Sequence, residues 1–228
     1  MIVLTADIHG IVNFKSIKKN IILKNLTMSD YFIVCGDFGI IWNEDNELLT
    51  WFNSQAFQTL FIDGNHENFS ILNNYPVTKW NGGKIHRISS KVIHLMRGQV
   101  FEIDEKKIFI FGGAFSLKKV SGNSPIYTWE EEMPSQNEYD EGLNNLKIKD
   151  FKVDYVLTHT APKKWLNEIN ELENEYERKL NEYLDEIEEK TQYRHWYFGH
   201  FHKDISKEKY TVLYKKIIFL RGDRYEYV

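Results

Sequence analysis

The stretch Ile2-Val3-Leu4-Thr5-Ala6-Asp7-Ile8-His9-Gly10 opens the chain and is the starting point for its interpretation. Its first four residues are apolar or β-branched, which predicts a short buried strand. An aspartate and a histidine follow two positions apart, and in an extended segment such residues project to the same side. A carboxylate and an imidazole placed in this way can hold one metal ion together. Alone, the Asp-x-His pattern is weak, because a surface turn explains it equally well.

Four later stretches repeat this arrangement of polar side chains after an apolar run. They are Gly36-Asp37-Phe38-Gly39, Gly64-Asn65-His66-Glu67, Thr158-His159-Thr160 and Gly199-His200-Phe201-His202. Each follows a segment that reads as a buried strand, and open α/β sheets build their sites at the carboxyl ends of strands. We therefore expect all five stretches to meet at one edge of a sheet.

These polar side chains are too many for a single metal ion, but they suit two adjacent ions that share a carboxylate. Asp37 offers two oxygens and can bridge. The first ion would take Asp7, His9, Asp37 and His202, and the second would take Asp37, Asn65, His159 and His200. Two cations about 3.5–4 Å apart promote attack on phosphate esters. The pattern therefore predicts a metal-dependent phosphoesterase.

The rhythm of strand, helix and strand over residues 1–62 predicts βαβ units with parallel pairing. Helices are expected within 14–26 and 47–57. Strand-like runs at 91–96, 99–103 and 107–111 indicate antiparallel hairpin structure around Asp104-Glu105-Lys106. Runs at 210–213, 216–220 and 224–227 are expected to close the fold as antiparallel strands.

Two further segments have a distinct character. Residues 116–145 are polar and punctuated by Gly and Pro, and they end in a predicted helix with a capping box of Ser135 and Glu138. We regard 116–145 as a candidate specificity loop. Residues 165–190 are predicted to form one long acidic helix with an apolar stripe. Its polar face is expected to be solvated, and binding of a partner is the alternative.

The bulk properties fit one domain that covers residues 1–228. Hydrophobic residues make up 42% of the 228 residues, which allows a sizeable core. The single Cys35 excludes an internal disulfide, and neither a signal peptide nor a membrane-spanning run is apparent, so a cytoplasmic protein without membrane contact is expected. The net charge of −4 gives no general case for nucleic-acid binding.

Taken together and in order, the five stretches resemble the calcineurin-like metallophosphoesterase superfamily. That pattern is Asp-x-His, Gly-Asp, Gly-Asn-His-Asp/Glu, His and Gly-His-x-His, and here it spans residues 7–202. The resemblance implies an α/β (α+β) fold, a four-layer α/β/β/α sandwich of two mixed sheets. It also implies the metal ligands assigned above, with His66 as the catalytic histidine near the leaving group and a metal-bridging hydroxide as the nucleophile.

The resemblance further implies two divalent transition-metal ions and a phosphoester substrate, which could be a nucleotide or a nucleic acid. Mn²⁺ is the first choice of metal, and Fe, Zn, Co or Ni would also suit these ligands. Both phosphodiesters and phosphomonoesters are open as substrates. Arg97 is a candidate substrate-binding residue, because its planar guanidinium can bind a phosphate. The alternative for Arg97 is an exposed turn residue.

One branch of the superfamily is a weaker match. Gly10 after His9, and Glu67 after His66, resemble the serine/threonine protein phosphatases and bis-nucleoside tetraphosphatases. That branch also carries Gly-Asp-x-Val-Asp-Arg-Gly, whose second Asp and Arg are missing here. The residue that orients His66 is therefore open, although Asp63 and Glu67 are its neighbours in sequence. A serine/threonine protein phosphatase-like enzyme or a dinucleotide-polyphosphate hydrolase is the second hypothesis, and a metal-free protein-binding scaffold is the third.

Overall fold

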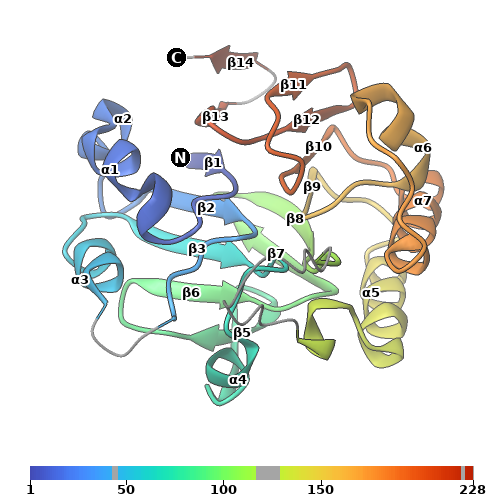
Figure 1. The fold of residues 1–228 in the computed structure, drawn as a ribbon, viewed down its shortest axis with the longest axis horizontal. Helices are drawn as coiled ribbons and strands as arrows, with labels where there is room; N and C mark the ends of the chain where they lie inside the picture. Colours follow the sequence, from blue (N-terminus) through green and yellow to red (C-terminus); the bar gives the residue numbers. More distant parts are fainter. Residues whose placement is uncertain (43–45, 117–128, 222–223, 228) are drawn as a thin grey trace, which may run out of the picture.

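Two mixed β-sheets form the centre of the computed structural model, which describes residues 1–42, 46–116, 129–221 and 224–227 (Figure 1). The first sheet has the strand order β14-β13-β1-β2-β3-β6-β5-β4, and the second has the order β11-β12-β10-β9-β8-β7. The strands of the first sheet are β1 Ile2–Thr5, β2 Tyr31–Cys35, β3 Gln58–Ile62, β4 Val77–Trp80, β5 Gly83–Arg87, β6 Val92–Leu95, β13 Ile218–Arg221 and β14 Arg224–Tyr227. The strands of the second sheet are β7 Gln99–Ile103, β8 Lys106–Phe111, β9 Tyr155–Thr158, β10 His195–Phe198, β11 Ile205–Ser206 and β12 Tyr210–Val212.

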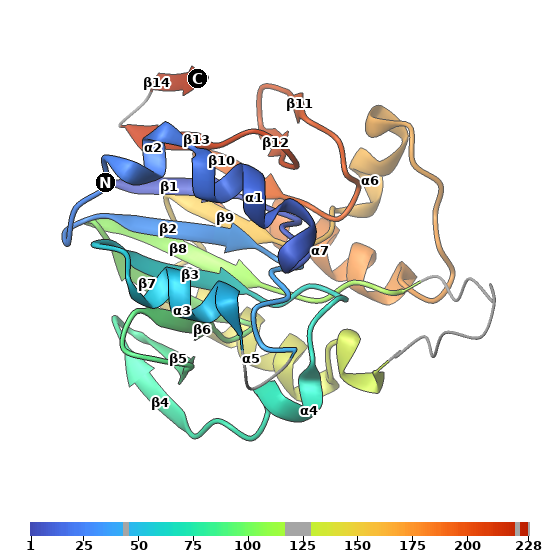
Figure 2. The same ribbon diagram turned by 60° about the vertical axis from the view of Figure 1, so that its left-hand side comes forward.

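Helices cover the outer face of each sheet (Figures 1 and 2). Those on the first sheet are α1 Ile11–Lys19, α2 Ile21–Lys24, α3 Glu47–Asn53 and α4 Phe69–Leu72. Those on the second sheet are α5 Gln136–Ile148, α6 Lys163–Leu166 and α7 Arg178–Lys190, with short 3₁₀ turns at Glu130–Glu132 and Asn167–Ile169. The expected four-layer α/β/β/α sandwich of two mixed sheets is confirmed.

Alternation of side chains along the strands explains the layers. In β2, Ile33 and Cys35 pack between the two sheets, whereas Phe32 and Val34 pack against the outer helices. In β8, Ile108 and the other alternate residues face the first sheet, while Phe109 and its counterparts face α5 and α7. Strands that are apolar on both faces in this way belong to buried, mainly parallel sheets.

Parallel pairing brings the functional loops together. Strands β1, β2, β3 and β6 run parallel, as do β8, β9, β10 and β12. The carboxyl ends of β1, β2 and β3 therefore share one edge of the first sheet, and those of β9 and β10 share one edge of the second. All five predicted loops follow one of these five strands.

The middle of the chain differs in part from the expectation. Strands β7 and β8 form the expected antiparallel hairpin, but β6 belongs to the other sheet, where it pairs with β3 and β5. The hairpin of β4 and β5 was not predicted from the sequence. Its turn, Asn81-Gly82, has φ of 44° and 96°, the left-handed backbone that Asn-Gly supplies in two-residue hairpins. The Asn-Gly dipeptide is the feature of the sequence that could have predicted this hairpin.

The prediction of one long helix over residues 165–190 is wrong. The chain forms α6 and a 3₁₀ turn, leaves the helical conformation at Asn170, whose φ is 57°, and resumes as α7 only at Arg178. Leu172, which we expected on the apolar stripe, is 90% exposed. Three asparagines (167, 170 and 174) and closely spaced glutamates disfavour a helix in this stretch, because asparagine competes for backbone hydrogen bonds and like charges repel.

The segment 116–145 is described in part, since residues 117–128 lie outside the described residues. Its expected helix is present as α5, and the capping box of Ser135 and Glu138 is confirmed. The role of 116–145 as a specificity loop stays a prediction. In the described part of the chain, no helix is both long enough and apolar enough to cross a bilayer.

Candidate metal centre

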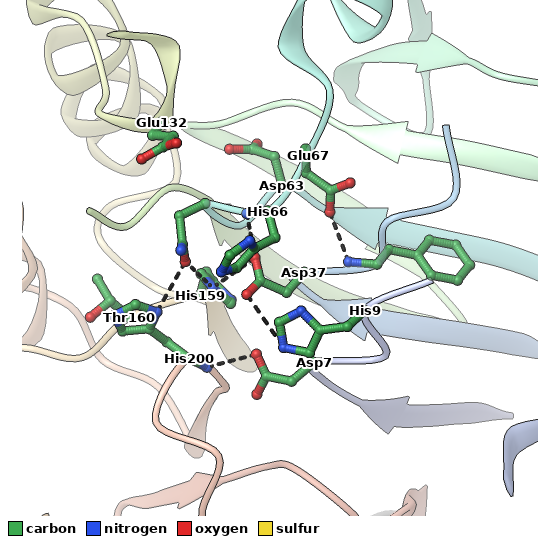
Figure 3. Close-up of polar contacts among 12 residues, drawn as sticks. Asp7, His9, Asp37, Asp63, His66, Glu67, Glu132, His159, Thr160 and His200 are labelled. Carbon is green, nitrogen blue, oxygen red and sulfur yellow. Dashed lines mark hydrogen bonds and ion pairs between the residues drawn. The ribbon is translucent and has the colours of Figure 1, made fainter. Parts of the chain in front are cut away.

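The five loops that follow β1, β2, β3, β9 and β10 meet at one place (Figure 3). Each loop contributes at least one of the side chains that we predicted to bind metal. Figure 3 shows Asp7, His9, Asp37, His159 and His200 gathered around a common centre, with His66 beside them. Three of the loops come from the first sheet and two from the second, so the centre lies across the edges of both sheets.

Backbone conformation turns the ligands inward. Among the predicted ligands, a positive φ between 51° and 67° is found for Asp7, His9, Asp37, His200 and His202. This left-handed region is uncommon for non-glycine residues and costs about 1–3 kcal/mol per residue. The loops after β1 and β2 hold each other in this form, because His9 N donates to the Asp37 carbonyl at 2.8 Å.

Two glycines of the motifs make room for ligands. A Cβ on Gly36 would lie 2.0 Å from Nδ1 of His159, and a Cβ on Gly64 would lie 2.1 Å from Oδ1 of Asp37. Real side-chain atoms do not approach so closely, so any other residue at either position would displace a ligand. The glycines are therefore required by packing around the centre.

The first ligand set is Asp7, His9, Asp37 and His202. One ligand atom from each residue lies within 4.8 Å of all the others. Nε2 of His9 is 2.8 Å from Nε2 of His202 and 3.7 Å from Oδ2 of Asp37. Four N and O donors at these separations suit a single divalent transition-metal ion.

The second ligand set is Asp37, Asn65, His159 and His200. Oδ1 of Asn65 is 3.1 Å from Nε2 of His159 and 3.1 Å from Nδ1 of His200. Nε2 of His159 is also 3.3 Å from Oδ1 of Asp37. Asp37 therefore directs Oδ2 to the first set and Oδ1 to the second, which is the arrangement of a bridging carboxylate.

Outer hydrogen bonds fix the ligand atoms of the second set. Nδ1 of His159 donates to the carbonyl of Cys35 at 3.0 Å, so Nε2 faces the centre. Nδ2 of Asn65 donates to the hydroxyl of Ser116 at 3.0 Å, which turns Oδ1 inward. A proton on a histidine nitrogen, or a cation, is needed between these inward-facing acceptors.

The electrostatics of the centre favour a cation. Oδ2 of Asp7 is buried and has no hydrogen-bond partner among the described residues, and burial raises the pKa of Asp7 to about 8 despite the opposing charge of His159. Burial lowers the pKa of His159, but the charges of Asp37 and Asp7 and the hydrogen bonds to Asp37 and Cys35 together raise that pKa to about 10. Burial lowers the pKa of His9 to about 4, against the pull of Asp37. A divalent ion would neutralise Asp7 and replace a proton on His159, so the residues fit the metals.

His66 lies beside both ligand sets. Its backbone N–H donates to Oδ1 of Asp37 at 2.8 Å, its side chain is exposed, and its ring centroid lies 5.2 Å from that of His9. Neither sequence neighbour orients it. Asp63 accepts from Arg97 and contacts His94, whereas Glu67 accepts from the backbone N–H groups of Phe38 and Gly39.

Arg97 is buried and bonded within the protein. Its guanidinium forms an ion pair with Asp63 at 2.6 Å and donates to the backbone carbonyls of Glu131 and Glu132 at 2.7 and 3.2 Å. The expected alternative, an exposed turn residue, is wrong, because Arg97 is only 6% exposed. These bonds give Arg97 a structural role, and its contact with substrate stays a prediction.

Three supporting residues were not assigned roles from the sequence. Glu67 holds the loop that carries Asp37, Ser116 holds Asn65, and Glu177 faces His200 at 3.6 Å. Glu67 stands next to a predicted catalytic residue, which is a usable signal. Ser116 and Glu177 are far from the motifs in sequence, and nothing in their local pattern separates them from other Ser and Glu residues.

Comparison with known proteins supplies the family. None of the curated proteins matches this chain. A Staphylococcus aureus structure, described as a candidate 5′-nucleotidase in complex with α-ketoglutarate, is similar at 13% identity with a TM-score of 0.46; the match covers 100% of this chain and 52% of that one. This chain thus spans about half the length of that protein. A protein of unknown function from Aquifex aeolicus is similar at 14% identity with a TM-score of 0.32, over 70% of this chain and 80% of that one.

The family model described as calcineurin-like phosphoesterase matches residues 1–204, which include all five loops. The expectation drawn from the motifs is confirmed at this level. The chain belongs to the calcineurin-like phosphoesterase family.

Proposed function

We propose that this protein hydrolyses phosphodiester or phosphomonoester bonds with two divalent metal ions bound at the Asp37 centre. The observation that carries the proposal is the orientation of Asp37, whose two oxygens face two different ligand sets. When bound, two ions would activate water and neutralise the charge of a phosphate ester. Mn²⁺ is our first choice, because both sets mix carboxylate or amide oxygens with imidazole nitrogens.

The protein's own residues would position the reacting groups. With metal bound, Asp7 and Asp37 would supply carboxylate oxygens from buried positions, and the histidines would supply neutral nitrogens to the same centre. His66 is tied to Asp37 through its backbone, while its exposed ring can reach a substrate that approaches from solvent. In its protonated form this imidazole can donate to the departing alkoxide, which is general-acid catalysis.

The experiment is a metal analysis followed by a substrate panel. Purified protein is stripped with EDTA, reloaded with Mn²⁺, and assayed on bis-p-nitrophenyl phosphate, p-nitrophenyl phosphate, cyclic nucleotides, dinucleotide polyphosphates and single-stranded nucleic acid. We expect about two ions per chain and activity that is lost with EDTA and restored by Mn²⁺. A well-folded protein that binds no metal, or activity that is insensitive to EDTA, would contradict the proposal.

A further inference from the structure

One carboxylate of the acidic stretch 168–177 is buried, whereas its neighbours are not. Glu177 is 4% exposed, while the adjacent Tyr176 is 63% exposed. It stands immediately before α7, at the end of the segment that departs from the predicted helix. Charged side chains are rarely buried unless they are paired and hydrogen-bonded, so its position needs a reason.

Donors from three separate segments fix the Glu177 carboxylate. Oε1 accepts from the hydroxyl of Thr160 at 2.5 Å and from the amide of Asn181 at 3.1 Å. Oε2 accepts from the backbone N–H of Phe115 at 2.9 Å. These bonds leave Oε2 facing Nε2 of His200 at 3.6 Å, an ion-pair distance that lies just beyond hydrogen-bond range.

The position of Glu177 bears on which nitrogen of His200 can bind a metal. A neutral imidazole carries its proton on one nitrogen only, and an acceptor near Nε2 favours the form with Nε2–H. Nδ1 then keeps its lone pair, and Nδ1 is the atom that lies 3.1 Å from Oδ1 of Asn65 in the second ligand set. His159 is arranged in the opposite sense, with Nδ1 bonded to the Cys35 carbonyl and Nε2 facing the centre.

Among the residues that the structure describes, no carboxylate takes the equivalent place in the first ligand set. Within the described ranges, the structure shows no carboxylate behind the outer nitrogens of His9 or His202; the ring of His202 instead stacks on Tyr214. A carboxylate behind a metal-binding histidine orients the ring and raises its basicity, and its loss typically costs about 10- to 100-fold in metal affinity.

From this geometry we infer that Glu177 is a positioning residue for the second metal ion, acting through His200. This inference rests on the proposed function, because it assumes that the centre binds two ions. It also gives a reason for the break in the predicted helix, since the break brings Glu177 to the site. Replacement of Glu177 should therefore weaken one metal-binding step and leave the other unchanged.

The test is a titration of metal-free protein with Mn²⁺. Binding is measured by calorimetry and, separately, by competition with a chromophoric chelator. Wild-type protein should bind two ions in two steps. Glu177→Gln should weaken binding of the second ion, which we expect to be the tighter step because outer hydrogen bonds fix its ligand atoms, by about 10- to 100-fold and leave the other step unchanged. Glu188→Gln, in the helix α7 that follows Glu177, is the matched control, because Glu188 is bonded to Lys164 and Lys209 and no contact joins it to a predicted ligand in the described part of the chain.

A second variant covers the case in which Glu177→Gln does not fold. Thr160→Val removes one hydrogen bond to Glu177 and keeps its charge, so a smaller loss in the same step is expected. Unchanged affinities in the folded Glu177→Gln protein would overturn the inference, and so would unchanged affinities in Thr160→Val if Glu177→Gln is unfolded. Wild-type protein that binds fewer than two ions would contradict the proposed function instead, before any variant is compared.

Discussion

The two ligand sets around Asp37 are built differently. In the second set, His159 is fully buried, Asn65 is 5% exposed, and an outer hydrogen bond fixes the ligand atom of each. In the first set, His202 is exposed and His9 is partly exposed, and both depend on left-handed backbone turns for their orientation. Asp37 therefore joins one ligand set that outer hydrogen bonds hold in place to another that is more exposed. We expect the second set to hold its ion more tightly.

Removal of the Asp37 side chain should have the largest effect on metal content and activity, because Asp37 belongs to both ligand sets. Asp37→Ala takes one ligand from each set at once. We expect both ions to be lost and activity on bis-p-nitrophenyl phosphate to fall below detection. Metal content per chain, measured by mass spectrometry, checks the result. Asp104→Ala is the control, because the Asp104 side chain is half-exposed and belongs to neither ligand set. An Asp37→Ala protein that keeps two ions would show that Asp37 does not bridge.

Replacement of His66 should leave both sets intact and affect turnover alone. His66→Ala is expected to keep wild-type metal content and to slow a substrate with a poor leaving group by about 10²–10⁴-fold, the usual range for loss of a general acid. Substrates with a p-nitrophenolate leaving group should be affected much less, because that group departs without a proton. Equal slowing on both kinds of substrate would exclude the acid role.

Single-ligand variants should separate the two halves. His159→Ala is expected to weaken only the second ion, by more than about 100-fold, because direct ligands matter more than the outer partners that cost 10- to 100-fold. His202→Ala should weaken only the first ion and by a smaller factor, since its side chain is exposed. Mn²⁺ titrations of the two metal-free variants give the comparison. Loss of both ions in either variant would mean that the sets are not independent.

In the metal-free protein, the buried Asp7 carboxylate of the first ligand set should lower the free energy of unfolding. Burial raises the pKa of Asp7 from 3.8 to about 8, so the folded form resists ionisation while the unfolded form does not. The contribution of Asp7 to the stability of the metal-free protein should therefore fall as pH rises from about 4 to 8. Asp7→Asn removes this charge and should be more stable than wild type by about 1–3 kcal/mol at pH 8 when both lack metal.

Thermal unfolding at pH 4.5, 6 and 8, with EDTA and with Mn²⁺, checks this prediction. The advantage of Asp7→Asn should grow with pH in EDTA and reverse in Mn²⁺, because only wild-type protein gains the full binding energy of the first ion. A pH-independent difference between the two proteins would indicate that Asp7 is not strained by its burial.

Much of the fold and of the centre could be predicted because the signals are local. Short apolar runs with a polar residue directly after each strand are visible in the sequence, and parallel pairing then brings those ends together. The prediction placed Asp7, Asp37, Asn65 and His159 at strand ends, and the structure gathers them where the edges of the two sheets meet. Their roles as metal ligands remain predictions.

What could not be predicted depends on tertiary contacts. The stretch 168–190 contains nine glutamates, and no local rule tells which of them is buried. Apart from Asn181, four residues further on, the residues that contact the Glu177 carboxylate are Thr160, Phe115 and His200, all of them distant in sequence. The same contacts favour a break where the apolar periodicity favoured a continuous helix. The burial of Arg97 could not be predicted either, because its ion-pair partner Asp63 lies 34 residues away in the sequence.

The left-handed turns at five ligand positions have a consequence for protein design. A grafting experiment that copied only the side chains onto another parallel sheet would aim most of them away from the intended ion. The unit to transfer is each whole loop with its left-handed backbone conformation, including the glycines that allow neighbouring loops to approach. Recipient scaffolds should therefore be chosen for loops that can adopt the left-handed backbone conformation directly after each strand, before any ligand is introduced.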